Sequence, residues 1–277
     1  MSTPSPTPAG TPSTGDPLAD HLRQHADRAR SGLAALEQEA EVEVVHDTRT
    51  SLRRVRATMR TFAGSFAAAE TVDEDLRFVA VALGAVRDAD VLAEALLPDL
   101  EAMPEELVPG PARGDLHDAL AARRRDALES VGRARMAPPW NRAVAQLTAW
   151  RDAPPVLAPQ DHARTLMKAR RRVRRRIQNS GGDPFSLHSA RKASKRWRYA
   201  AELLVEVEPV AGMHLERAME VQRVLGQVQD AVIALEFLRE HADLGARSGH
   251  NAFSTGLLFA RAQQRLESST QQALGLF

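Results

Sequence analysis

The sequence predicts an all-α fold, built as two pseudo-symmetric antiparallel helical bundles. Apolar residues recur at helical spacing through most of the chain, and no stretch shows the alternation of a β-strand. A basic pattern in residues 46–56 returns in residues 188–198, so that His46 corresponds to His188. The same offset pairs Leu83-Gly84 with Leu225-Gly226, and Asp88 with Asp230. Because one offset relates several separate motifs, it indicates an internal duplication.

Composition narrows the class of protein. Hydrophobic residues make up 43% and aromatic residues 4%, so the core must be aliphatic and rich in alanine. There is no cysteine, which excludes disulfides, thiolate metal sites and cysteine nucleophiles. No run reaches the roughly 18 apolar residues that a membrane span needs, and no secretory signal pattern is present. We therefore expect a cytoplasmic protein that does not enter a membrane.

Proline-rich and glycine-rich stretches divide the chain. Residues 1–16 are rich in Ser, Thr and Pro and are predicted to form a disordered tail. Residues 17–136 then form the first helical repeat. Residues 137–158 contain a linking helix and a proline-rich connector, and residues 159–277 form the second repeat.

Local signals set the expected helix boundaries. Asp16 before Pro17 is a typical helix start, and Asp183 before Pro184 is another. The pattern Thr71-Val72-Asp73-Glu74 predicts a capping box. Gly84, inside a helical pattern, predicts a close approach by another helix. The expected helices span 17–39, 43–68, 71–103, 115–135, 138–151, 160–179, 184–207, 211–242 and 250–275.

The net charge of +1 hides a strong segregation of charge. Residues 162–198 carry thirteen Lys or Arg against one acid, whereas residues 70–106 carry eleven acids against two arginines. Residues 200–243 are also acidic. We therefore expect the basic helices to share one face or cleft, with the acidic segments lying largely elsewhere.

The repeated basic pattern forms a ridge on a helix. At 100° per residue its imidazole and guanidinium groups fall on one stripe beside an apolar stripe. No acid lies between Arg49 and Arg60, although an ordinary solvated face mixes charges of both signs. Binding of an anionic partner accounts for this row of positive charges without acids. The ridge holds His46, Arg49, Arg53, Arg56 and Arg60 in the first copy, and His188, Arg191, Lys195 and Arg198 in the second.

Two further features belong to the predicted site. Glu202 stands where the first copy has Arg60, so the second ridge is a turn shorter. The helix predicted at 160–179 adds a second basic stripe whose members lie within about 60° of one another. These members are Arg164, Lys168, Arg171 and Arg175.

The sequence resembles the CHAD domain, the conserved histidine α-helical domain. Two copies of His-x-x-Arg-x-x-x-(Arg/Lys)-Arg-x-Arg, each followed by Leu-Gly-x-x-x-Asp, carry the resemblance, which covers about residues 17–275. It implies two pseudo-symmetric helical bundles that bind inorganic polyphosphate on a basic surface. Some members of the family lie near polyphosphate granules, and others are fused to a CYTH triphosphatase domain. Because a Glu-x-Glu-x-Lys opening and a β-rich region are both missing, the chain resembles the standalone binding type.

The residues agree with a polyphosphate ligand. Arginine donates two hydrogen bonds to one phosphate group, and a polymer without bases needs no aromatic stacking platforms. Binding of duplex nucleic acid or of polyanions in general stays open, because phosphate contacts alone give affinity. His46 and His188 either bind phosphate or are structural, and phosphotransfer through them is a weaker alternative.

Catalysis is not expected. Asp88 and Asp230 are predicted to pair with ridge arginines rather than to act as catalytic acids, although a phosphohydrolase is kept as a third, weaker hypothesis. His21 and His25 have zinc-ligand spacing, but no third ligand lies in register. We therefore expect a binding protein that is not an enzyme and has no metal or cofactor.

Overall fold

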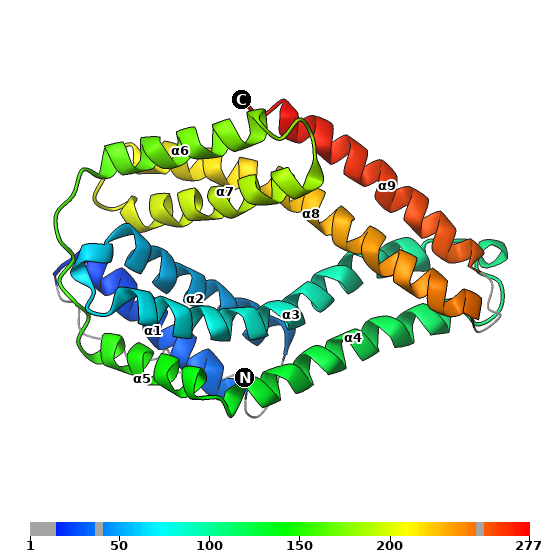
Figure 1. Cartoon of the computed structure of the whole chain (residues 1–277), viewed down its shortest axis with the longest axis horizontal. Coiled ribbons are helices and arrows are strands. Elements are labelled where there is room, and N and C mark those ends of the chain that lie inside the picture. The colour runs from blue at the N-terminus through cyan, green and yellow to red at the C-terminus, as the bar shows by residue number, and fades with distance from the viewer. Residues whose placement is uncertain (1–14, 37–40, 248–251) are drawn as a thin grey trace, which may run out of the picture.

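The computed structural model describes residues 15–36, 41–247 and 252–277. These residues form helices and no strand, which confirms the predicted fold class (Figure 1). The predicted tail lies almost entirely outside the described residues. The helices are α1 (Pro17–Ala35), α2 (Val42–Thr61), α3 (Ala69–Glu101), α4 (Ala112–Arg135), α5 (Pro138–Asp152), α6 (His162–Gln178), α7 (Pro184–Leu204), α8 (Ala211–Arg247) and α9 (Phe253–Leu274).

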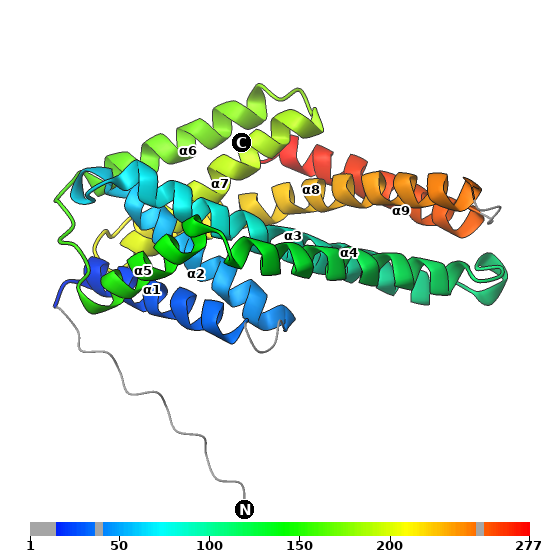
Figure 2. The ribbon, with the colours of Figure 1, turned by 60° about the horizontal axis from the view of Figure 1, so that its bottom comes forward.

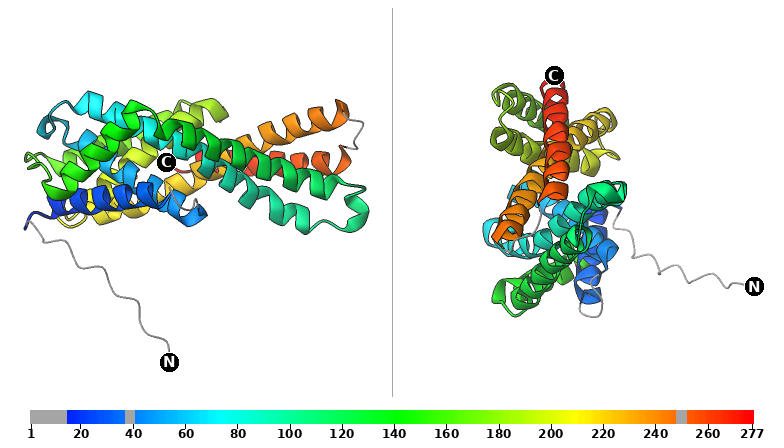
Figure 3. Two further views of the ribbon diagram at one scale, coloured as in Figure 1. Left: turned by 90° about the horizontal axis from the view of Figure 1, so that it is seen from below. Right: turned by 90° about the vertical axis from the view of Figure 1, so that its right-hand side faces the viewer.

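The helices of the two repeats follow the sequence offset. Helices α2 and α7 begin at Val42 and Pro184, and helices α3 and α8 begin at Ala69 and Ala211. Both pairs of starts are separated by the same offset as His46 and His188. Seen end-on, helices α1–α5 form one group and helices α6–α9 another, with the end of α8 reaching toward the first group (Figure 3). Whether the two repeats superpose stays a prediction.

The hydrophobic core is shared between the repeats. One cluster of buried side chains joins α1, α2, α3 and α5 to α6, α7 and α8, and it contains both Leu52 and Trp197. A second cluster joins the outer halves of α3 and α8 to α4 and α9, and it contains Leu100 and Leu258. Figure 2 shows the α3–α4 and α8–α9 pairs extending together. Each cluster therefore depends on helices from both repeats.

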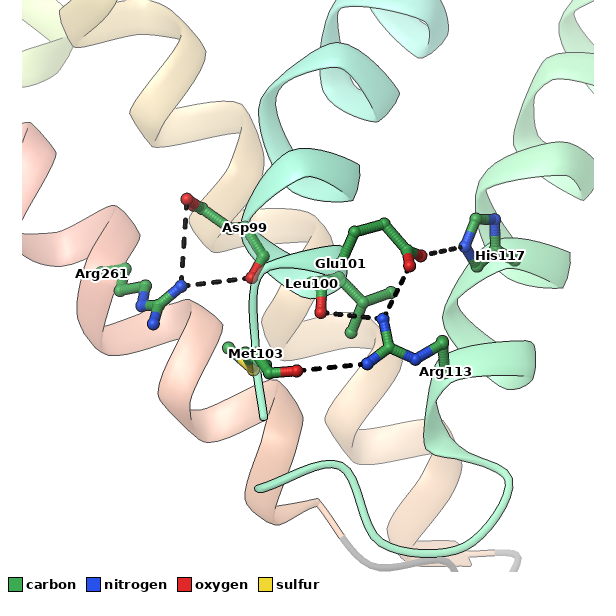
Figure 4. A network of polar contacts seen from close by, with 7 residues as sticks. All are labelled: Asp99, Leu100, Glu101, Met103, Arg113, His117 and Arg261. Atoms are coloured by element: carbon green, nitrogen blue, oxygen red, sulfur yellow. Dashed lines mark hydrogen bonds and ion pairs between the residues drawn. The ribbon is translucent and has the colours of Figure 1, made fainter. Parts of the chain in front are cut away.

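Ion pairs close the outer end of these paired helices (Figure 4). Asp99 at the end of α3 lies 2.5 Å from Arg265 and 4.0 Å from Arg261, both on α9. Arg113 of α4 contacts Glu101 at 2.9 Å, and it also donates to the carbonyl oxygen of Leu100 at 3.0 Å. The pairs of Asp99 therefore hold the end of α3 against the second repeat, whereas those of Arg113 hold α4 against α3. Among the described helices, none is long and apolar enough to cross a membrane.

Two predicted helix caps are confirmed, and one is wrong. The Asp16 carboxylate accepts from the Leu18 amide at 3.0 Å, and Asp183 caps α7 in the same way. Helix α3, however, begins at Ala69, after a left-handed residue, and lacks a side-chain cap. The predicted capping box is therefore inside the helix. Its Asp73 side chain instead binds arginines of α2.

The structure differs from two further expectations, on the end of α2 and on the surroundings of Gly84. Helix α2 ends at Thr61 rather than 68, and Phe66 beyond its end still packs edge-on against Trp150 at 5.3 Å. A Cβ atom at Gly84 would only touch the Arg49 guanidinium at 3.6 Å, so no helix backbone approaches there. The close approach lies at Gly32, where an added Cβ would be 1.9 Å from the hydroxyl of Thr48.

Candidate functional site

The two ridge helices meet at a cluster of cations. Helix α2 packs against α7 and brings Arg49 and Arg53 within electrostatic reach of Arg191 and Lys195. We call these four residues the central cluster. Arg53 and Lys195 are equivalent in the two copies of the repeat, as are Arg49 and Arg191. The cluster therefore joins the same helical turns of the two copies.

Burial and like charge act together on the central cluster. Burial, followed by repulsion from Arg53, Arg191 and Arg49, lowers the pKa of Lys195 to about 6. Burial and the Arg53 charge lower the pKa of Arg49 to about 10. Cations held this closely at the edge of a protein core favour a bound anion.

Two carboxylates partly balance the central cluster. Arg49 Nη2 lies 3.6 Å from Asp88 Oδ1, and Arg191 Nη2 lies 3.8 Å from Asp230 Oδ1. The predicted pairing of both acids with ridge arginines is thus confirmed. These separations exceed a normal hydrogen bond, so the guanidinium groups keep donors for a ligand. Burial raises the pKa of Asp230, although Arg191 and Lys195 oppose this shift.

The outer part of the α2 ridge has its own counter-ion. Arg56 binds the Asp73 carboxylate through two hydrogen bonds of 2.9 and 3.2 Å, and Arg60 binds it at 2.8 Å. Although burial alone would raise the pKa of Asp73, these hydrogen bonds hold it below its ordinary value. Asp88 and Asp230 were expected beside ridge arginines, whereas Asp73 belongs to a segment expected to lie largely elsewhere and nevertheless joins them. A half-buried row of arginines requires counter-ions, and helices α3 and α8 supply them.

The two motif histidines have different surroundings. His46 is exposed near the start of α2. His188 is half-buried, and its Nδ1 forms a short hydrogen bond with Gln229 Oε1 on α8. If Nδ1 donates this bond, Nε2 is left to accept a hydrogen bond or, when protonated, to donate one. The repeat equivalent of Gln229 is Arg87, which binds Glu94 at 2.6 Å instead.

The remaining predicted site residues do not join the central cluster. On α6 the predicted stripe is exposed and lies opposite the buried Val173 and Ile177. Arg198 is half-buried, with its guanidinium carbon 5.7 Å from the centre of the Tyr199 ring. The exposed α6 stripe consists of Arg164, Lys168, Arg171 and Arg175.

Sequence reasoning missed an ion pair between the ridge helices. Arg54 Nη2 of α2 lies 2.5 Å from Glu202 Oε1 of α7, and both side chains are about one-fifth exposed. Glu202 is the residue that interrupts the second ridge, so this departure from the repeat was the available signal. Both residues act electrostatically on His21 of α1, and Arg54 also acts on His25.

Helix α1 closes this side of the site with neutral histidines. Burial, the largest effect, lowers the pKa of His21 to about 4 and that of His25 to about 2. Their rings pack edge-to-face at 4.5 Å. Within the described part of the chain, no group of three or more potential metal ligands occurs.

A cavity of about 280 Å³ opens beside the central cluster. It lies between α3, α8 and α9, and Asp230, Gln227 and Arg265 contribute its polar groups. Ser268, Ser269 and Gln272 of α9 add further polar groups, and Ala95, Ala231 and Ala234 complete the lining. No member of the central cluster lines this cavity, and Asp230 is the residue that connects the two.

Comparisons with known proteins agree with this architecture. A sequence profile of the family described as CHAD domain matches residues 15–239. PptA from Streptomyces chartreusis superposes with a TM-score of 0.74 at 21% identity, covering 95% of this chain and 99% of that one. The CHAD domain from the plant Ricinus communis gives a TM-score of 0.68 at 22% identity, covering 92% and 90%. At these identities, the likeness establishes the fold.

Relatives of greater length occur among curated proteins. The Mycobacterium tuberculosis proteins named Uncharacterized protein MT2285 and Uncharacterized protein Rv2226 are each 28% identical to the chain over 290 residues. The match covers 97% of this chain and 54% of each relative. The chain therefore spans about half the length of these relatives.

Proposed function

This chain belongs to the CHAD domain family, and from that premise we propose that it binds inorganic polyphosphate at the central cluster. The observation that carries the proposal is the meeting of Arg49, Arg53, Arg191 and Lys195 between α2 and α7. The two nearby carboxylates leave this cluster with an excess of positive charge. Phosphate oxygens supply the missing negative charge and accept the charge-assisted hydrogen bonds that arginine donates.

The position of the cluster favours a narrow polyanion. The cations are half-buried between two packed helices, so their ligand must be thin enough to reach them. A bare phosphate chain meets this condition, whereas a DNA duplex carries its phosphates on a much wider cylinder. Binding of a duplex or of polyanions in general is the second candidate. The exposed α6 stripe favours it, because an open row of cations can contact any polyanion.

The same proposal describes binding without hydrolysis. Asp88 and Asp230 are the two carboxylates that the sequence offered as candidate catalytic acids. Each of them is paired with a cluster arginine. In this arrangement both carboxylates serve as counter-ions for the cluster arginines. We extend the proposal to a cytoplasmic protein associated with polyphosphate granules.

Titration with long-chain polyphosphate and with duplex DNA of equal total charge tests the proposal. Two double variants, Arg49→Ala with Arg53→Ala and Arg191→Ala with Lys195→Ala, should each weaken polyphosphate binding by at least tenfold, since a hydrogen bond to a charged group contributes about 1.5–3 kcal/mol. Affinity should also fall steeply with added salt. Free phosphate, measured in the same samples, should not rise.

The exposed α6 stripe supplies the matched control. Arg171→Ala with Arg175→Ala removes two basic side chains, as each cluster variant does, but from a face directed away from the core. We expect this variant to keep most of its polyphosphate affinity. If it loses as much as the cluster variants do, the ligand lies on α6. Equal affinity for DNA, lost in the same cluster variants, would favour the general polyanion binder.

A further inference from the structure

The contact between α2 and α7 differs between its α1 side and its α6 side. On the α1 side, Arg54 and Glu202 form the ion pair at 2.5 Å. The repeat equivalent of Arg54 is Arg196, and that of Glu202 is Arg60. On the α6 side, the two positions equivalent to this ion pair are therefore both occupied by arginine.

Helix α6 adds more cations to this side. Helix α7 packs against both α6 and α2 (Figure 1). Arg196 is exposed on α7, and Arg60, Arg176 and Arg172 lie within electrostatic reach of it. Arg176 donates to the Ser189 carbonyl oxygen at 2.9 Å, which holds its side chain against α7.

The charges on the α6 side are only partly balanced. Asp73 binds Arg60, but it also accepts two hydrogen bonds from Arg56. Partial desolvation by the neighbouring helices, followed by repulsion from the three arginines named above, lowers the pKa of Arg196. On the α1 side, by contrast, the charges are balanced, since Arg54 is paired with Glu202 and the two histidines are neutral.

We propose that Arg60, Arg172, Arg176 and Arg196 form a second anion site, which binds the part of a condensed-phosphate chain that leaves the central cluster. The inference rests on the proposed function. The α2 ridge connects the two sites, because Arg49, Arg53, Arg56 and Arg60 rise about 16 Å along one helix face. A bound chain therefore extends toward α6 and not toward α1. Short oligophosphates fill the central cluster, whereas longer chains also reach the second site.

One substitution tests this directly. Arg196→Glu places a carboxylate opposite Arg60 and so recreates, on the α6 side, the arrangement that Arg54 and Glu202 form on the α1 side. Tripolyphosphate affinity should stay within about twofold, while long-chain affinity should fall about tenfold, the loss expected from one charge-assisted contact. Thermal stability should not fall, because repulsion among the arginines is relieved.

Controls separate this site from a general charge effect. Arg125→Glu makes the same charge change on an exposed position of α4 and should leave both affinities unchanged. If Arg196→Glu does not fold, Arg60→Gln with Arg172→Gln provides the same two readouts.

The possible outcomes distinguish failure of the second anion site from failure of the proposed function. An unchanged long-chain affinity in the Arg196 variant, or an equal loss for tripolyphosphate and long chains, would overturn the second site and leave the central cluster intact. Failure of the wild-type protein to bind either ligand would instead overturn the proposed function itself.

Discussion

Arg49 on α2 and Asp88 on α3 form an ion pair with 3.6 Å between Nη2 and Oδ1. Arg191 and Asp230 repeat this pair at 3.8 Å in the second copy. In both copies the carboxylate is near enough to attract the guanidinium but too far to occupy its donors in a normal hydrogen bond. The acids therefore reduce repulsion within the central cluster while leaving the arginines able to bind phosphate.

Asp88→Asn tests this balance. Removing the negative charge should raise polyphosphate affinity severalfold at low salt, because the positive potential of the cluster increases. The free energy of unfolding should decrease, since the arginines of the cluster lose a counter-ion. Isothermal titration and denaturant unfolding measure the two effects. A clear loss of affinity would show that Asp88 mainly orients Arg49 for binding.

Lys195 should take up a proton when polyphosphate binds. Its pKa of about 6 makes it mostly neutral at pH 7.5 in the free protein, mainly because of burial and then because of the nearby arginines. A bound polyanion favours the ammonium form and raises the pKa toward the ordinary value of 10.5. Calorimetry in buffers with different ionisation enthalpies should therefore detect proton uptake at pH 7.5.

Lys195→Arg is the control for proton uptake. It places at this position the residue type that the first repeat has at Arg53. The guanidinium stays charged before and after binding, so the uptake should disappear while binding persists. Proton uptake of the same size in this variant would assign it to another group.

The Arg54–Glu202 ion pair should stabilise the contact between the repeats. Its side chains are 19% and 22% exposed, so solvent screens them only in part. Glu202→Gln should lower the free energy of unfolding by about 1–3 kcal/mol, as expected when a partly buried charge loses its partner. A double-mutant cycle with Arg54→Gln should give a coupling energy well above zero. Additive effects of the two substitutions would contradict a direct interaction.

Acid should destabilise the fold through its buried histidines. The pKa of His21 is about 4 and that of His25 about 2 in the folded protein, chiefly because of burial, against an ordinary value of 6.5. Below pH 6.5 the unfolded chain binds these protons first. Stability is therefore lost as the pH falls from 6.5 to about 4, and His25 extends the loss to lower pH. Above pH 6.5 neither histidine contributes to the pH dependence.

His25→Leu should reduce this acid sensitivity. The substitution removes a titrating group and also the buried Nδ1, which has no hydrogen-bond partner in the structure. Unfolding measured between pH 7 and pH 4 should show a shallower slope than that of the wild-type protein. An unchanged slope would assign the acid sensitivity to other groups.

The sequence by itself determined the local structure and the composition of the ridge. Helix boundaries agree within a few residues at most ends, because apolar periodicity and caps such as Asp16 are properties of neighbouring residues. The repeated motif predicted the pairing of Asp88 and Asp230 with ridge arginines, since equivalent residues in two copies indicate a shared contact. It also identified the four residues of the central cluster.

Tertiary structure decided which side chains meet. Asp73 lies within a capping-box pattern in the sequence but binds Arg56 and Arg60, because α3 begins at Ala69 and places that pattern inside the helix. The α6 stripe was equally basic in the sequence, yet packing of Val173 and Ile177 turns it away from α7. Helical periodicity shows which residues share a face, but the face that becomes buried depends on the helices that pack against it.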